Sequence, residues 1–125
     1  MSSTLKPFEK QKYLNLETFR KTGEGVKTPV WFAQDGDILR IWTETSTGKA
    51  KRIRRDGKVR IVPSTSSGQP TGEWVDARAV VVDKPEDVAR TEQLFKKKYG
   101  LMFSFLSFVN KSRKGKYISI KVNLA

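Results

Sequence analysis

The sequence KTPVWFAQDGDILRIWTET, residues 27–45, places two runs of β-branched and aromatic residues on either side of an Asp-Gly pair. Asp-Gly between two such runs is a strong signal for a β-hairpin, because glycine tolerates the positive φ that a tight turn requires. We therefore predict a strand over Lys27–Ala33, a turn over Asp35–Asp37 and a partner strand over Ile38–Thr45. Pro29 has no N–H, which predicts that the first strand lies at an edge of the sheet or at a bulge.

Four further segments on either side of this hairpin have the composition of strands. In the last of them Ile118, Ile120 and Val122 alternate with polar residues, the pattern of a strand with one buried face. Six strands joined by short connections predict an all-β dominated fold with a mostly antiparallel sheet. Because closure removes exposed edges, we expect a small closed or partly closed barrel. The four segments are Tyr13–Phe19, Lys58–Ser64, Trp74–Asp83 and Lys116–Leu124.

Helices are few in the predicted fold. The clear one covers Lys84–Gly100, with a proline and two acids in its first turn, three lysines in its last turn and a glycine at its end. Gly48–Asp56 shows no alternation and predicts a short helix. The apolar run Leu101–Val109 lacks the basic face of a membrane-surface helix, so we expect burial in the core or in a dimer contact.

The composition is that of a soluble globular protein. Hydrophobic residues make up 37% and charged residues 30% of 125 residues, which predicts a single domain, residues 1–125, with one modest core. The chain has no cysteine and no histidine, so thiolate chemistry is excluded and we predict no metal site. No apolar run reaches the roughly 18 residues of a membrane span, and the N-terminus lacks a signal-peptide stretch, so we expect a cytoplasmic protein without a membrane partner.

Basic residues follow the hairpin in a dense run. Lys and Arg number 25 against 13 acids, and the formal net charge of +12 predicts an anionic partner. Directly after the second hairpin strand come hydroxyl donors, a glycine that allows close backbone approach, and lysines, which together are suited to a phosphate. From the pattern alone, a solvated basic surface is an equal alternative. The residues concerned are Thr43, Thr45, Ser46, Gly48, Lys49 and Lys51.

The tryptophans have two interpretations. Trp31, Trp42 and Trp74 all fall in predicted strands. An aromatic residue on a strand is more often part of a core than of a ligand site. Pro29–Trp31 is therefore interpreted first as packing.

Several motifs of the chain occur in a particular order. A PVWF strand, a DG hairpin, the run TETSTGKAKR (residues 43–52) and the run GEWVDARA (residues 72–79) follow one another. From Tyr13 to about Asp83 this order resembles the pyridoxamine 5'-phosphate oxidase-like split-barrel flavoproteins. Within them it is most similar to the small deazaflavin (F-420)-dependent branch.

The resemblance implies a six-stranded antiparallel Greek-key split barrel that forms a homodimer, with the cofactor in a groove between subunits. The cofactor would be the deazaflavin coenzyme F-420, or FMN as the alternative. The resemblance implies that the hydroxyls and basic residues after the hairpin hold the cofactor phosphate, that the stretch from residue 27 to 30 follows the ring system, and that a tryptophan is contributed by the partner. These residues are Thr43, Thr45, Ser46, Lys49, Lys51 and Arg52; Lys27, Thr28, Pro29 and Val30; and Trp74.

The function implied is an oxidoreductase that transfers a hydride between F-420 and an unidentified conjugated small molecule. The cofactor carries such chemistry, so the absence of His and Cys is no obstacle, and no catalytic residue is assigned. An FMN-dependent oxidoreductase and a non-catalytic FMN-binding protein are alternatives. A nucleic-acid-binding barrel, which stacks bases along a basic groove, is a further alternative that accounts for the charge but not for the order of motifs. We expect only nonspecific attraction of nucleic acid.

Overall fold

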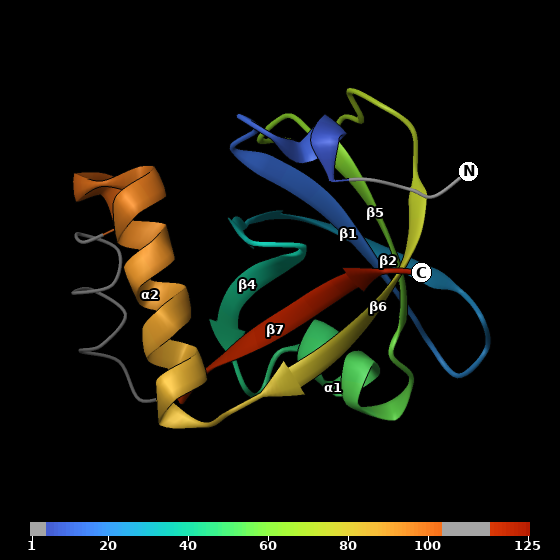
Figure 1. The fold of residues 1–125 in the computed structure, drawn as a ribbon. Helices are drawn as coiled ribbons and strands as arrows, with labels where there is room; N and C mark the ends of the chain where they lie inside the picture. The colour runs from blue at the N-terminus through green and yellow to red at the C-terminus, as the bar shows by residue number, and fades with distance from the viewer. Residues whose placement is uncertain (1–4, 104–115) are drawn as a thin grey trace.

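The computed structural model describes residues 5–103 and 116–125. Its strands form one sheet in the order β2-β1-β5-β6-β7-β4-β3, in which all neighbouring strands are antiparallel. Figure 1 shows the short helix α1 (Gly48–Arg55) below the sheet and the longer helix α2 (Pro85–Tyr99) at its side. The strands are β1 (Tyr13–Phe19), β2 (Gly25–Trp31), β3 (Ala33–Asp35), β4 (Ile38–Glu44), β5 (Lys58–Ser64), β6 (Val75–Val82) and β7 (Tyr117–Leu124), and a 3-10 turn, η1 (Lys6–Phe8), precedes them.

The two edges of this sheet, β2 and β3, are consecutive in the chain, and only Phe32 lies between them. A sheet whose first and last strands are one residue apart must curl until its edges meet. The strands therefore enclose a barrel that is split where β2 ends and β3 begins. The prediction of a β-dominated antiparallel split barrel is confirmed.

The prediction of six strands is wrong, because the predicted strand Lys27–Ala33 forms parts of two strands. The ladder of β2 with β1 ends at Trp31, and the ladder of β3 with β4 begins at Ala33. The backbone of Phe32 instead bonds to Tyr99 of α2, whose hydroxyl accepts the Phe32 N–H at 3.0 Å. A change of partner strand within a continuous apolar run leaves no mark in the sequence, so seven strands appear where six were expected.

The hairpin at the Asp-Gly pair is confirmed. Strands β3 and β4 are joined by Gly36 and Asp37, and Gly36 has a φ of 64°. The prediction for Pro29 is also confirmed, because β2 pairs on one side only, with β1. The missing N–H of this proline therefore breaks no second ladder.

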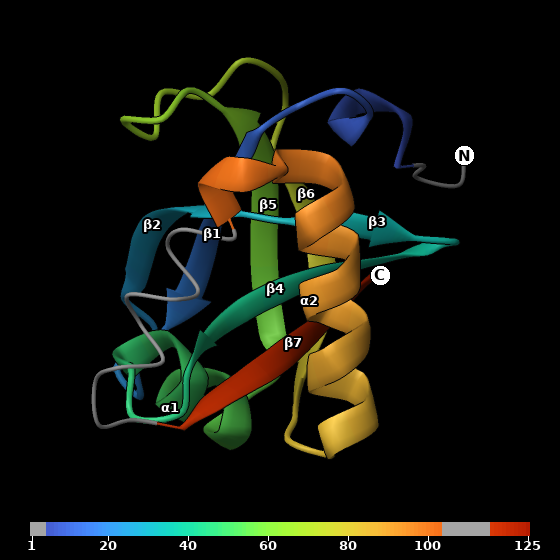
Figure 2. The same ribbon diagram turned by 90° about the vertical axis from the view of Figure 1, so that its left-hand side faces the viewer.

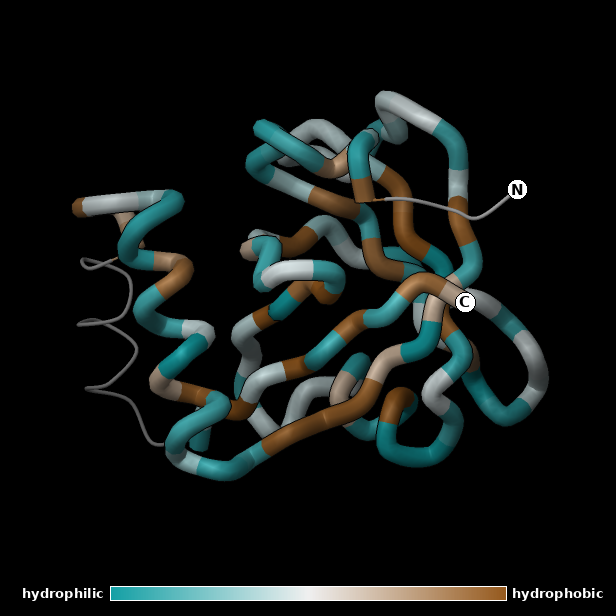
Figure 3. The backbone as a smooth tube through the Cα atoms, viewed as in Figure 1, coloured by the Kyte–Doolittle hydropathy of each residue, from teal (hydrophilic) through white to brown (hydrophobic). Residues whose placement is uncertain are grey.

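The core fills the barrel and extends to α1. Leu16, Ile41 and Ile120 point inward from three strands and are at most 1% exposed. Figure 3 shows the alternation of hydrophobic and hydrophilic residues along β7 that the sequence predicts. The predicted short helix is present as α1, which begins at the N-cap Thr47 and packs Ala50 and Ile53 into the same core.

Helix α2 covers the outer face of the barrel over β3, β4 and β7 (Figure 2). Its buried Thr91 hydroxyl lies 2.6 Å from that of Ser119 on β7. Beside this contact the guanidinium of Arg40, on β4, binds Asp35 at 2.8 Å and Asp87 of α2 at 3.5 Å. The predicted long helix is therefore confirmed, and polar pairs fix its position. Of the apolar run that follows it, only residues 101–103 are described, and they are helical; the rest lies outside the described residues.

Candidate functional site

A small cavity lies where the ends of β2 and β4 meet both helices. Its volume is about 200 Å³. Aromatic side chains from the sheet and from the helical segment over it form most of its wall, and Trp42 of β4 meets Phe103 edge to face at 5.2 Å. The lining residues are Val30, Trp31, Trp42, Thr43, Lys49, Phe95 and Phe103.

The polar side of the cavity is formed where β4 leads into α1. Thr43 is nearly the last residue of β4, and its hydroxyl lies 3.5 Å from that of Thr47, the N-cap of α1. The Thr47 hydroxyl accepts the Ala50 N–H, as N-cap residues do. The first N–H groups of a helix have no intrahelical acceptor, and those of Gly48 and Lys49 find no other acceptor in the described part of the chain.

Lys49 brings a positive charge into this polar side. The residue is half-buried in the first turn of α1. Burial lowers the pKa of its ammonium group, and repulsion from the Arg52 guanidinium lowers it further. Among the described residues no carboxylate lines the cavity, so nothing there compensates this charge. An anion would be stabilised at this position.

Trp42 supplies an unused donor. Its ring stacks on Tyr117 at 4.1 Å between centroids and meets the edge of Phe103 at 5.2 Å. The Nε1–H of Trp42 is buried and has no hydrogen-bond partner in the described part of the chain. Buried donors are nearly always paired, and an orphan beside a cavity indicates a place for an acceptor. Together with Lys49 and Thr43, this indole gives the cavity donors that fit an anionic, oxygen-rich group.

The other predicted phosphate residues lie around this cavity rather than in it. Thr45 accepts hydrogen bonds from the Arg54 guanidinium, and Ser46 donates to Glu44. Lys51 is exposed. It lies two residues beyond Lys49, which on a helix is about 200° around the axis and therefore nearly opposite. The structure thus brings Thr43 and Lys49 together and separates them from the rest of the run.

Arg52 has a structural partner. Its Nε donates to the hydroxyl of Thr18 on β1 at 2.6 Å. Burial lowers the pKa of its guanidinium, and the nearby Arg20 lowers it further. Arg52 therefore ties α1 to the sheet.

The predicted residues on β2 face different surroundings. Val30 lines the cavity, and Thr28 pairs with Leu16 on β1. The ammonium group of Lys27 lies 5.2 Å from the ring centre of Trp74, which also lies 5.1 Å from the guanidinium carbon of Arg60. Trp74 thus lies next to cations of β2 and β5 and does not line the cavity.

The sequence interpretation assigned no site role to four lining residues. The sequence predicts core packing for Trp31 and Trp42, and burial in the core or in a dimer contact for the run that contains Phe103. It predicts no site role for Phe95. The alternation of side chains along a strand could have separated Trp42 from the core. Leu39 and Ile41 are buried inside the barrel, so Trp42 lies on the outer face of β4. No local pattern reveals that α2 returns over that face.

Residues 5–103 and 116–125 contain neither a metal-ligand cluster nor a membrane-spanning helix. No group of three or more acidic side chains there could hold a metal ion. No helix in those residues is long and apolar enough to pass through a membrane.

Known proteins resemble this chain in structure and not in sequence. No family model and no curated protein matches the sequence. The heme storage protein HutZ from Vibrio cholerae superposes with a TM-score of 0.71 at 15% identity, covering 98% of this chain and 92% of its own. An F420 reductase gives 0.64 at 19% identity, covering 100% and 95%. A putative pyridoxamine 5'-phosphate oxidase from Listeria innocua gives 0.65 at 14% identity, covering 96% and 89%.

These three proteins carry names of different kinds, and each superposes on nearly the whole of this chain. At no more than 19% identity, the likeness concerns the fold. The chain has the split-barrel fold of the pyridoxamine 5'-phosphate oxidase-like proteins.

Proposed function

We propose that this protein is an oxidoreductase that uses a flavin-type cofactor, with the deazaflavin F-420 as the leading candidate and FMN as the alternative. The observation that supports this proposal best is the cavity at Lys49, where a desolvated ammonium group and the orphaned Trp42 Nε1–H face no carboxylate. The likeness to an F420 reductase is in keeping with it.

The residues that would hold the cofactor's phosphate are Lys49, Thr43 and Trp42, together with the N–H groups at the start of α1. These donors combine a charge, a hydroxyl, an indole and the positive end of a helix dipole, all of which favour an anion. When bound, the cofactor supplies the hydride chemistry, and the protein contributes position and electrostatics. Trp31 and Val30 would present an apolar surface beside the phosphate site.

The cavity is smaller than the cofactor requires. Small-molecule sites usually have volumes of about 300–1,000 Å³, against about 200 Å³ here. One chain would therefore enclose only the phosphate end. We propose that the rest of the cofactor lies outside the cavity, along β2, and that a second copy of the chain completes the groove. The exposed Leu101 and Met102, which are 89% and 61% accessible, are available for such a contact.

The preference for F-420 over FMN rests on charge. F-420 carries a phosphodiester and a glutamate tail, whereas FMN has a single terminal phosphate. A chain of net charge +12 suits the more anionic molecule. The acceptor would be a conjugated small molecule.

Cofactor titration with two matched lysine variants tests the proposal. Removal of a charged partner from a phosphate costs about 1.5–3 kcal/mol, so Lys49→Ala should weaken F-420 binding by about tenfold or more. Lys51→Ala removes the same charge from the opposite side of the same helix and should change the dissociation constant by less than about threefold. Binding is followed by cofactor fluorescence. Equal dissociation constants for all three proteins, or no uptake of either cofactor, would contradict the proposed site.

Salt dependence distinguishes this function from nucleic-acid binding. A protein that covers many backbone phosphates loses affinity steeply as salt rises, because each contact releases counterions. One cofactor phosphate held in a half-buried cavity should show a shallower dependence. We expect nucleic-acid binding to vanish near physiological salt and cofactor binding to persist. Tight nucleic-acid binding at that salt without cofactor uptake would favour the alternative.

A further inference from the structure

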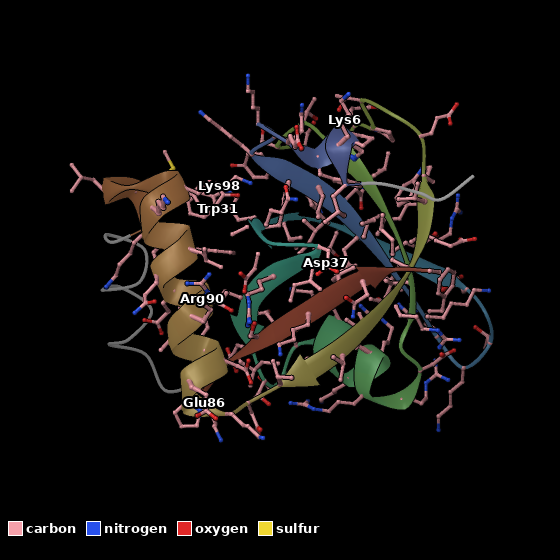
Figure 4. The ribbon with its side chains drawn as sticks, viewed as in Figure 1. Lys6, Trp31, Asp37, Glu86, Arg90 and Lys98 are labelled. Atoms are coloured by element: carbon pink, nitrogen blue, oxygen red, sulfur yellow. The ribbon has the colours of Figure 1, made fainter. Side chains whose placement is uncertain are left out.

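A second cavity borders the first and shares Trp31 with it. Its volume is about 360 Å³, within the usual range of small-molecule sites. Residues far apart in the chain meet here: the start of β1, the end of β2, the β5–β6 loop and the end of α2. In Figure 4, Lys98 and Trp31 lie next to each other between the end of α2 and the barrel. The lining residues are Lys12, Tyr13, Trp31, Ser66, Lys98, Tyr99 and Met102.

The walls of this cavity are held in place by hydrogen bonds. The Tyr99 hydroxyl lies 2.6 Å from the Lys12 carbonyl and 2.9 Å from the Phe32 carbonyl, so it links the segment before β1 to the junction of β2 and β3. The Tyr99 ring stacks on Trp31 with centroids 4.2 Å apart. A site whose walls are fixed in this way loses little conformational entropy when a ligand binds.

The charge of the cavity is positive and uncompensated. Two of its lining side chains are lysines, and among the described residues no carboxylate lines it. The Lys98 ammonium donates to the Phe32 carbonyl at 2.7 Å and lies 3.6 Å from the centre of the Phe32 ring. Burial lowers the pKa of Lys98 to about 8. The amine can donate three hydrogen bonds, and this one contact leaves two of them for a ligand.

The remaining walls are flat and apolar. Tyr13 meets Trp31 edge to face at 6.4 Å, and Met102 adds a polarisable side chain. Aromatic rings and methionine sulfur favour contact with another ring system. The cavity therefore combines surfaces for a planar ligand with ammonium groups for an anion, and Ser66 adds a hydroxyl.

We propose that this second cavity binds a planar conjugated carboxylate, with Lys98 as the residue that contacts the carboxylate and Trp31 and Tyr13 as the residues that contact the ring. The proposal that such a carboxylate is the substrate rests on the proposed oxidoreductase function. The proposal that the cavity binds it depends only on the described residues and can be tested without any cofactor.

The test uses the full chain without cofactor and two probes of the same ring system. 2-Naphthoate carries a carboxylate, and 2-naphthol is neutral at pH 7. Isothermal titration should show at least tenfold tighter binding of 2-naphthoate, because only this probe can form a charge-assisted hydrogen bond with Lys98. In an NMR titration the indole N–H signal of Trp31 should shift and that of Trp74, which lies next to cations of β2 and β5, should not. Equal affinity for both probes, or a shift at Trp74 alone, overturns the proposal.

Three lysine variants locate the charge. Lys98→Gln should weaken 2-naphthoate binding about tenfold. Lys97 is an exposed neighbour that lines neither cavity, so Lys97→Gln should change the dissociation constant by no more than about twofold. Lys98→Arg keeps the charge and should retain most of the affinity, which also controls for misfolding of Lys98→Gln. Equal losses in the Lys97 and Lys98 variants would show general surface attraction and overturn the assignment.

The outcome is separable from that of the cofactor titration. Cofactor uptake without binding of 2-naphthoate would leave the proposed function intact and reject the second site. Binding of 2-naphthoate without cofactor uptake would support the site and reject the oxidoreductase as its context.

Discussion

The hydroxyl of Tyr99 accepts the N–H of Phe32 at 3.0 Å and lies 2.9 Å from the carbonyl oxygen of the same residue. A side chain of α2 thus replaces a neighbouring strand at the single residue where the edge of the sheet passes from β2 to β3. Both peptide groups are removed from water, since Phe32 is 1% exposed. The split of the barrel is therefore closed by the helix, and the same contact forms a wall of the second cavity.

Tyr99→Phe should destabilise the fold. The substitution leaves the buried Phe32 N–H without an acceptor, which costs about 1–3 kcal/mol. Urea denaturation followed by circular dichroism measures the change in the free energy of unfolding. Tyr13→Phe is the control, because no hydrogen bond of the Tyr13 hydroxyl is found among the described residues, and it should cost much less. Equal losses of stability in the two variants would mean that the hydrogen bond between Tyr99 and Phe32 makes no contribution of its own to the free energy of unfolding.

The Lys98 amine should lose its proton near pH 8, whereas an ordinary lysine does so near 10.5, because burial disfavours its charged form. The rate of its acetylation, followed by mass spectrometry of the modified peptide, should therefore reach half its maximum near pH 8. A midpoint near 10.5 would show that the ammonium group is fully hydrated.

The same shift has a consequence for stability. Between pH 8 and 10.5 the unfolded chain binds a proton at Lys98 that the folded chain has released, so the free energy of unfolding gains a contribution that rises with pH in this window. Lys98→Met lacks this contribution. The difference in stability between wild type and variant should therefore change in favour of wild type as pH rises from 8 to 10.5, and a constant difference would contradict the shift.

Asp35 should make the fold sensitive to acid. Hydrogen bonds from Arg90 and Arg40 lower the pKa of its carboxyl below the ordinary 3.8. Its contribution is therefore fully present above that value and is lost as pH falls through the folded-state pKa. Asp35→Asn should cost on the order of 2–3 kcal/mol at neutral pH, because Arg40 is left largely buried with fewer partners.

The control for Asp35 is its exposed neighbour in the hairpin. Asp37→Asn removes the same charge at a position with no ion pair among the described residues, so it should hardly change the free energy of unfolding. Chemical denaturation at pH 7 and at pH 3 compares the variants. A loss for Asp35→Asn that stays the same at both pH values would argue against the carboxylate as its origin.

Dimer formation should be detectable in solution. We expect sedimentation velocity at micromolar concentration to give twice the chain mass of 14.2 kDa. Leu101→Asp places a charge on the most exposed large hydrophobic side chain among the described residues and should shift the equilibrium toward monomer. A wild-type monomer with full cofactor affinity would contradict the proposed groove between subunits.

The sequence by itself determined the elements whose physical cause is local. Runs of β-branched and aromatic residues defined the strands, and in the last strand the alternation of apolar and polar residues also showed which face is buried, because successive side chains of a strand face opposite sides. The Asp-Gly pair defined the hairpin of β3 and β4, and the proline, acids, lysines and glycine of α2 defined its ends. The +12 charge and the hydroxyl-rich start of α1 indicated an anion, and their order along the chain indicated the split barrel.

Only the tertiary structure decided which of these residues meet. Lys49 and Lys51 are equivalent in the sequence, and the rotation of α1 places the first at a cavity and the second in solvent. Phe32 belongs to a continuous apolar run, and the closure of the barrel makes it the junction of two strands. The cavity at Trp42 exists because α2 returns over the outer face of β4. Such contacts join residues many positions apart, and a short-range pattern carries no information about them.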